Sequence, residues 1–299
     1  MAEDLCRGVD HPDEVEIHAV RAFAVDENES RLRRLLSVTG EACECTYDRS
    51  DWTRKEGRTL VRLPNGGRAE LFHASGALRV VTGLEPMAAL FASVDKAENL
   101  TRLVDKAALR LHLQEWVSPP GRLEFERLWQ IKAAAADRKR VVGPILCRAV
   151  GAYRQSIGRL PVLGGASVAV KIAAEGRLDS ISMQLVETHS EPVETARLIG
   201  AEAATHAVAR LLDSLLGADQ RSRSDLNVKV QPLQLGYLHP GKRKPLRTLA
   251  PHYFASVEIE KEEEEAQAYH LIVPATERIY QPLCFAGREA PIAAQRRAA

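Results

Sequence analysis

Two histidines and two tyrosines flank one basic loop in the carboxyl-terminal third of the chain. Tyr237 and His239 precede the loop, and His252 and Tyr253 follow it. An imidazole titrates near neutral pH, so it could act as a general acid or base with a phenol as its partner. If the flanking strands pair as a hairpin, the four side chains converge at one end of a sheet. They form the candidate catalytic group, with exposed or capping histidines and tyrosines at the edge of the core as the structural alternative.

Three aromatic residues on expected strands form a second candidate group. Phe125, Trp129 and Tyr153 could line a pocket on a curved sheet and hold a ligand there. The alternative for all three is ordinary packing in the core.

The chain contains five cysteines, of which Cys43 and Cys45 are separated by one residue. They could supply two soft metal ligands, but a closed zinc site takes four ligands in paired short spacings. We therefore expect two ordinary thiols and no metal. The sequence contains no Walker loop, dinucleotide fingerprint or Gly-x-Ser-x-Gly element, so we expect no cofactor.

Composition excludes several classes of partner. The 299 residues are 45% hydrophobic and 27% charged, with a net charge of +1, as in a globular chain with a buried core. Without a basic face or interleaved aromatics we expect no nucleic-acid partner, and we interpret the loop Lys242-Arg243-Lys244 as solvated. No apolar run approaches a membrane span and no leader segment is evident, so we expect no membrane partner and a cytoplasmic location with reduced thiols.

Periodicity and turn residues predict the elements that must position these groups. Alternating apolar residues predict strands, and a 3.6-residue period predicts helices. The Asn65-Gly66 and Ser75-Gly76 dipeptides predict hairpin turns, and Glu175-Gly176 predicts a tight turn in a central hairpin over 158–187. Gly40 is the expected stop of the first helix. The expected helices cover 29–38, 84–117 and 191–216. The expected strands lie in 14–25, 58–82, 123–134, 141–155, 158–187, 226–239, 249–260 and 269–273.

The order of these elements predicts an α+β fold of two units, each with a long helix packed on an antiparallel β-sheet. No regular βαβ alternation is present, so a parallel sheet is not expected. The expected divisions are an N-terminal α+β segment with a β-meander (1–90), a helix with a four-stranded antiparallel sheet (91–190), a second helix with antiparallel strands (191–275) and a loose tail (276–299).

Residues 150–275 carry motifs of a known family. Their segments Leu160-Pro161-Val162-Leu163-Gly164-Gly165 and Ala174-Glu175-Gly176-Arg177 are followed by Gly236-Tyr237 and by Leu249, Pro251 and Tyr253. This pattern resembles the PepSY and fungalysin/thermolysin-propeptide group. The resemblance implies a cystatin-like α+β module that binds or inhibits another molecule, often a peptidase.

Two functional hypotheses follow from the sequence. The first is a non-catalytic binding module that holds a peptide, small molecule or partner protein on a sheet face or in a cleft. The alternative is a cofactor-independent biosynthetic enzyme (a cyclase, isomerase or hydrolase) that uses the His/Tyr group for acid–base chemistry. The absence of catalytic motifs favours the first.

Overall fold

A computed structural model describes residues 12–47, 50–92, 96–136, 141–165, 167–216, 226–261, 267–281 and 295–296. The chain divides into two compact units, which are described separately below. The larger unit contains residues 20–190 and 239–247, and the smaller unit contains residues 1–19, 191–238 and 248–299.

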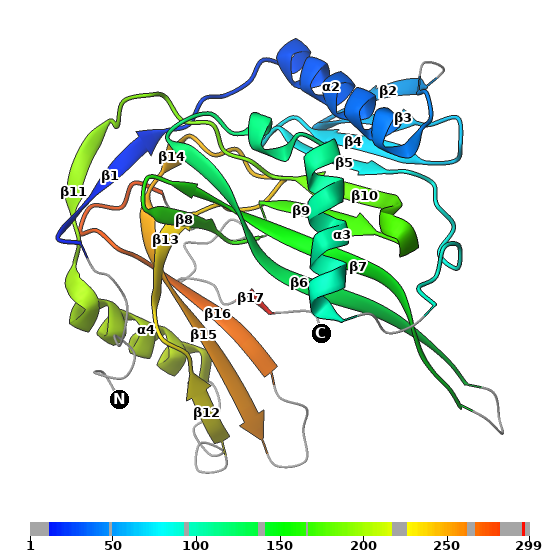
Figure 1. The fold of residues 1–299 in the computed structure, drawn as a ribbon. Coiled ribbons are helices and arrows are strands. Elements are labelled where there is room, and N and C mark those ends of the chain that lie inside the picture. Colours follow the sequence, from blue (N-terminus) through cyan, green and yellow to red (C-terminus); the bar gives the residue numbers. More distant parts are fainter. Residues whose placement is uncertain are drawn as a thin grey trace. The chain divides into compact units, whose positions relative to one another are not determined.

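An antiparallel sheet forms the larger unit (Figure 1). Its strands follow the order β2-β3-β4-β5-β10-β9-β7, and β7 also pairs with β6 and β8. The Asn65-Gly66 and Ser75-Gly76 turns join β3, β4 and β5 as the sequence predicts, and both glycines have a positive φ. The strands are β2 (Asp51–Lys55), β3 (Arg58–Arg62), β4 (Arg68–Phe72), β5 (Ala77–Val81), β6 (Gly121–Ala136), β7 (Val141–Ile157), β8 (Leu160–Leu163), β9 (Val168–Ile172) and β10 (Leu178–Met183).

Two helices pack on this sheet and seal its core. Helix α2 (Val25–Cys43) contacts β4, β5 and β10, and helix α3 (Ala97–Arg110) contacts β6, β7 and β9. Each helix turns an apolar stripe inward: Leu32, Leu35 and Leu36 on α2, Leu100 and Val104 on α3. A short 3₁₀ turn, η1 (Leu113–Trp116), follows α3, and another, η2 (Ala174–Gly176), joins β9 to β10.

A buried ion pair ties the loop after β5 to the sheet. The Arg148 guanidinium donates to the Asp179 carboxylate at 2.8 Å, and both side chains are almost fully buried. Arg148 also donates to the carbonyls of Glu85 at 2.7 Å and Ala88 at 3.1 Å, while Lys171 contacts the second Asp179 oxygen at 2.8 Å. These bonds hold residues 85–88 in place and satisfy both buried charges.

The smaller unit is also built from antiparallel strands. Strand β15 pairs with β12, β13 and β16, β16 pairs with β17, and a separate three-stranded sheet has the order β11-β1-β14. Helix α4 (Gly200–Leu216) packs against β16. The strands are β1 (Glu14–Ala19), β11 (Glu194–Arg197), β12 (Leu226–Val230), β13 (Gln234–Leu238), β14 (Thr248–Leu249), β15 (Pro251–Lys261), β16 (Gln267–Pro274) and β17 (Gln295–Arg296).

The prediction of two cystatin-like α+β units, each with one long helix on its own sheet, is wrong. Strands make up 45% of the structure and helices 23%, and a large multi-stranded sheet dominates it. The β-meander assigned to the N-terminal segment joins the sheet of the central hairpin, because β5 pairs with β10. Both α2 and α3 consequently lie on one sheet. Local turn signals reveal hairpins, but they do not reveal which distant strands pair.

Two expected helices are longer than the observed ones. The helix expected over 84–117 is limited to Ala97–Arg110, and the one expected over 191–216 begins at Gly200. Residues Glu194–Arg197 instead pair with β1 as strand β11. Gly200 then takes a φ of 77°, which is a left-handed conformation that separates this strand from the helix.

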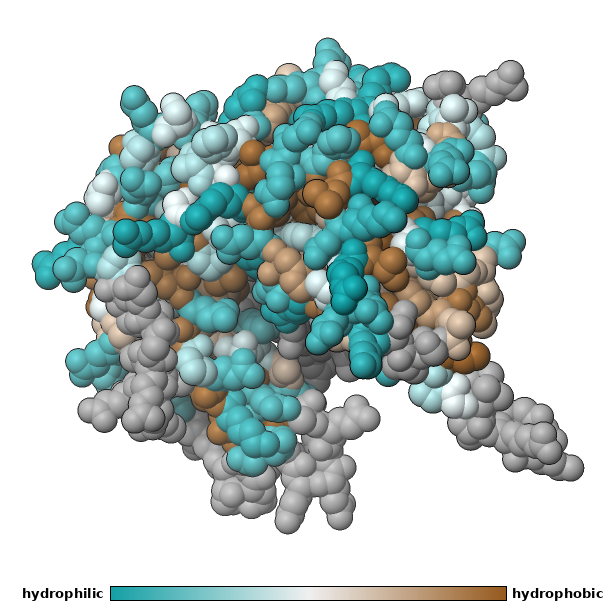
Figure 2. Space-filling view, viewed as in Figure 1, coloured by the Kyte–Doolittle hydropathy of each residue, from teal (hydrophilic) through white to brown (hydrophobic). Residues whose placement is uncertain are grey.

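The surface combines hydrophilic and hydrophobic residues, as Figure 2 shows for one face. Large hydrophobic side chains are exposed on β6 and β7: Phe125, Trp129, Ile131 and Ile145. None of the described helices combines the length and apolar composition that a membrane-spanning helix requires. Most of the expected loose tail, the acidic run Glu262–Glu265, Cys6 and Cys284 lie outside the described residues.

Candidate functional site

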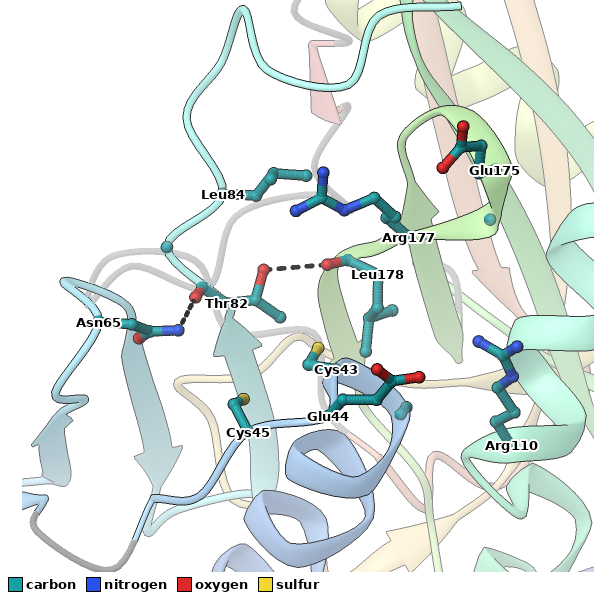
Figure 3. A pocket seen from close by; sticks show the side chains of 13 residues that line it. Cys43, Glu44, Cys45, Asn65, Thr82, Leu84, Arg110, Glu175, Arg177 and Leu178 are labelled. Atoms are coloured by element: carbon teal, nitrogen blue, oxygen red, sulfur yellow. Dashed lines mark hydrogen bonds between the residues drawn. The ribbon is translucent and has the colours of Figure 1, made fainter.

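A cavity of about 500 Å³ opens in the larger unit beside the C-terminal ends of α2 and α3 (Figure 3). Its volume falls within the range of small-molecule sites. Its wall is mostly polar and comes from five separate segments of the sequence. The lining residues are Ala42, Cys43, Glu44, Cys45, Asn65, Thr82, Gly83, Leu84, Arg110, Glu175, Gly176, Arg177 and Leu178.

The end of α2 forms one wall through a tight reversal of the chain. Glu44 adopts a left-handed conformation (φ 55°, ψ 39°), and its N–H donates to the Glu41 carbonyl at 3.2 Å. The Cys45 N–H donates to the Gly40 carbonyl at 2.9 Å. A Cβ atom on Gly40 would lie 2.7 Å from the Cys45 carbonyl oxygen, so the reversal needs glycine there. The sequence predicted Gly40 as the helix stop, but α2 continues three residues further, to Cys43.

The opposite wall is the turn between β9 and β10. Glu175 (φ 62°) and Gly176 (φ 72°) both have left-handed backbones, as the Glu-Gly turn in the sequence predicts. A non-glycine residue in this conformation is strained, and such residues are frequent at functional sites. Among the described residues, four non-glycine residues have a positive φ, and two of them, Glu44 and Glu175, line this cavity.

Hydrogen bonds fix the wall between these two segments. The Thr82 hydroxyl is within 3.0 Å of the carbonyls of Leu178 and Asp179, and the Asn65 amide donates to the Thr82 carbonyl at 2.6 Å. Gly83 has a φ of 83°, and a Cβ atom there would lie 2.7 Å from backbone atoms of Asn65 and Gly67. The wall is therefore rigid before any ligand binds, which lowers the entropic cost of binding.

Four charged side chains line the cavity: Arg110 at the end of α3, Arg177 before β10, and the carboxylates Glu44 and Glu175. All four are exposed to solvent. Neither arginine forms an ion pair or a side-chain hydrogen bond with any residue that the structure describes. The two guanidinium groups are thus available to a ligand, and the lining carries two positive and two negative charges.

Two thiols and a phenol lie beside these charges. Cys43 and Cys45 are free and half-buried, and both line the cavity. Burial raises the pKa of Cys43 to about 11, and the pKa of Tyr47 is also raised, mainly by burial. Both groups are therefore neutral near pH 7. Among the described residues, no group of three or more His, Cys, Asp or Glu side chains could hold a metal ion.

Three members of the candidate catalytic group lie in the smaller unit. Tyr237 and Tyr253 are fully buried, and His252 is 1% exposed. The Tyr237 hydroxyl donates to the Glu16 carbonyl at 2.9 Å, and His252 Nδ1 donates to the Ala250 carbonyl at 2.9 Å. Burial raises the pKa of Tyr237 and lowers the pKa of His252 to about 4. The β13–β15 pairing places Gly236 opposite His252, and Tyr237 opposite Pro251.

The fourth member, His239, belongs to the larger unit. It is 5% exposed, and its Nδ1 accepts hydrogen bonds from the Gly241 N–H at 3.1 Å and the Gln184 amide at 2.6 Å. Burial lowers its pKa to about 4, so the ring is neutral near pH 7. His18, which was not part of the group, is buried in the smaller unit with its ring centre 5.7 Å from that of Tyr237.

The structure brings together two of the three aromatic residues proposed for binding. Phe125 and Tyr153 lie opposite each other on β6 and β7, with ring centres 5.6 Å apart at an edge-to-face angle. Tyr153 is buried, and its hydroxyl donates to Asp105 at 3.0 Å. Trp129 is 43% exposed and packs beneath the Arg127 guanidinium. None of the three lines the cavity described above.

Sequence reasoning missed the charged residues of the cavity. Arg110 ends a helix whose apolar stripe was recognised, and Arg177 follows a turn that was recognised. Their side chains converge because α3 packs against the β9–β10 turn and α2 contacts both α3 and β10. No local spacing in the sequence signals that convergence.

Comparison with known proteins identifies a solved structure of similar fold. No family model and no curated protein sequence matches the chain. A crystal structure of an uncharacterized protein from Eubacterium rectale ATCC 33656 is similar, with a TM-score of 0.59 and 12% identity, over 91% of this chain and 87% of that one. At this identity the similarity shows the fold alone. The resemblance to the PepSY group therefore stays a prediction.

Proposed function

We propose that the protein is a non-catalytic binding module that holds a small ligand of mixed charge, such as a short peptide, in the cavity beside α2 and α3. The proposal rests on one observation. The guanidinium groups of Arg110 and Arg177 have no ion pair or side-chain hydrogen bond with the described residues, and they line the same cavity as the Glu44 carboxylate. Figure 3 shows these side chains around one opening.

The chemistry of the lining selects for a zwitterion. A guanidinium group binds a carboxylate through two parallel N–H···O bonds, and a carboxylate accepts from an ammonium group. A short peptide with free termini carries one group of each kind. A lining with equal numbers of positive and negative charges favours such a ligand over a polyanion, which the Glu44 and Glu175 carboxylates would repel.

The same side chains offer little to catalysis. A cysteine nucleophile acts as the thiolate, yet the pKa of Cys43 is raised to about 11. No histidine lines this cavity in the described part of the chain. The enzyme hypothesis depends on Tyr237, His239, His252 and Tyr253, all of which are at most 5% exposed and which belong to two different units. These features support binding over catalysis.

Isothermal titration with trialanine tests the proposal. We expect binding of the peptide with free termini, and a loss of affinity of at least about tenfold when either terminus is blocked by acetylation or amidation. The Arg110→Gln variant should lose affinity in the same way, because the glutamine side chain is neutral.

Arg102→Gln is the matched control, since Arg102 is an exposed residue of the same helix that does not line the cavity. Equal affinity for free and doubly blocked trialanine would show that charge does not select the ligand. Equal loss in the Arg110→Gln and Arg102→Gln variants would place binding outside the cavity.

A further inference from the structure

The two cysteines of the cavity wall are separated by one left-handed residue. In helical backbone of either hand, Cα atoms two residues apart are about 5.4 Å apart, given a radius of about 2.3 Å and a rise of about 1.5 Å. Glu44, with φ 55° and ψ 39°, therefore holds the Cα atoms of Cys43 and Cys45 at this separation. Disulfides span Cα separations of about 4.4–6.8 Å, with most near 5.5–6 Å. An extended residue at position 44 would place them near about 6.6 Å, at the upper limit.

The side chains of this pair are close to each other and to a positive charge. The Cys45 thiol is one of the groups that raise the pKa of Cys43, and the positive charge of Arg177 acts in the opposite direction. The Tyr47 phenol interacts with both thiols. With the backbone already in place, bond formation needs only rotation of the two short side chains.

The pair is also accessible from solvent. Both thiols line the cavity of about 500 Å³, and Cys45 also lines a second, shallower cavity of about 780 Å³ next to Trp52. Cys147 provides a contrast within the same unit: it is 6% exposed on β7, and its thiol donates to the Ile145 carbonyl. A small oxidant can therefore reach Cys43 and Cys45 more easily than Cys147.

We infer that Cys43 and Cys45 are a thiol modification site that closes to an intramolecular disulfide when a low-molecular-weight disulfide oxidises it. One thiolate attacks the S–S bond of the oxidant, forms a mixed disulfide and releases one thiol. The second cysteine then attacks the protein sulfur of that mixed disulfide and releases the second thiol. The two cysteines lose two protons and two electrons, and the oxidant is reduced to two thiols. This inference does not depend on the proposed ligand.

Glutathione disulfide, added in excess to the purified full-length protein, tests the inference. After free thiols are alkylated and the protein is digested with trypsin, both cysteines lie in one peptide, Leu35–Arg49, which contains no other cysteine. We expect this peptide to lose the mass of two hydrogens, to carry neither glutathione nor an alkyl group, and to regain both thiols after reduction.

Single substitutions distinguish closure from simple thiol exchange. In the Cys43→Ser variant the mixed disulfide on Cys45 cannot be resolved, so the glutathione adduct should be at least about tenfold more abundant than in the wild type. The control variant Cys147→Ser should close as the wild type does. A lasting glutathione adduct on wild-type Cys43 or Cys45, two alkylated cysteines, or a bond to Cys6 or Cys284 would overturn the inference.

Discussion

The charged cavity of the larger unit and the buried His/Tyr group of the smaller unit place titratable side chains in opposite environments. In the cavity, the side chains of Arg110, Arg177 and Glu44 are exposed to water. In the smaller unit, Tyr237, His252 and Tyr253 are buried, and burial favours the neutral forms of Tyr237 and His252. The residues with the more familiar catalytic chemistry are those that a substrate cannot reach. Residue type indicates what chemistry is feasible, but burial decides whether it is available.

The difference follows from the cost of removing charge from water. Burial of an ionisable group without a partner favours its neutral form, as the pKa of His252 shows. Guanidinium groups do not lose their charge in proteins and therefore stay at the surface or pair, as Arg148 does with Asp179.

Tyr253→Ala should have the largest effect, and on stability alone. Removal of a fully buried aromatic ring leaves a cavity and should lower the free energy of unfolding by about 4 kcal/mol. Urea denaturation of the full chain measures this change. Arg177→Ala is the comparison and should change the free energy of unfolding by less than about 0.5 kcal/mol, because its side chain is exposed. Similar losses of unfolding free energy in both variants would contradict the difference in burial between the His/Tyr group and the cavity lining.

Acid should destabilise the protein through its buried histidines. The pKa of His252 is about 4 in the folded state and about 6.5 when unfolded, so the unfolded chain takes up its proton first as the pH falls. Stability is fully retained above pH 6.5 and decreases between about pH 6.5 and 4. The loss from His252 at pH 5 should be about 2 kcal/mol.

The pH dependence can be assigned by substitution. His252→Gln should reduce the difference in the free energy of unfolding between pH 7 and pH 5, because that side chain no longer titrates. His206→Gln should leave the difference unchanged, since His206 is exposed on α4. An unchanged pH dependence in the His252→Gln variant would show that this imidazole is not protected from protons.

Arg177→Gln should affect binding but not folding. The loss of one bidentate guanidinium–carboxylate contact should weaken trialanine binding about tenfold, which titration calorimetry measures. The urea midpoint should not move. A shift in the midpoint with unchanged affinity would mean that Arg177 stabilises the β9–β10 turn and does not hold a ligand.

Glu44→Gly should have the smallest effect, and it should increase the stability of the protein. Glycine adopts the left-handed conformation at position 44 without steric cost, so the free energy of unfolding should rise by up to about 1 kcal/mol. Glu41→Gly, three residues earlier in the exposed final turn of α2, should lower it by about 1 kcal/mol. Urea denaturation distinguishes the two signs. A loss of stability in both variants would contradict the strain assigned to Glu44.

Much of the local structure could be predicted from the sequence. Asn65-Gly66, Ser75-Gly76 and Glu175-Gly176 identify turns, because their glycines require positive φ, and alternating apolar residues identify the strands around them. The apolar stripe of α3 was recognisable, but its start was not. Residues 84–92 are apolar enough to resemble a helix, yet Arg148 binds their carbonyls in an irregular loop.

The fold and the cavity could not be predicted in the same way. Pairing of β5 with β10 joins residues 77–81 to residues 178–183, and no turn chemistry records such a distant contact. Arg110, Arg177 and Glu44 become neighbours through the packing of α3 on the β9–β10 turn and of α2 on α3 and β10. The aromatic and histidine candidates were chosen by residue type, which does not report burial. Phe125 and Tyr153 do meet, because they lie in register on adjacent strands.

The buried pair of Arg148 and Asp179 has a consequence for how this sequence can change over evolutionary time. Loss of Asp179 alone leaves the buried Arg148 guanidinium without a counter-charge, at a cost of about 3–5 kcal/mol, which is a large part of the stability of a typical domain. Loss of Arg148 alone still leaves Lys171 beside Asp179 at 2.8 Å and should cost less. We therefore expect few related sequences to keep Arg148 without an acidic residue at position 179, so the two positions should covary.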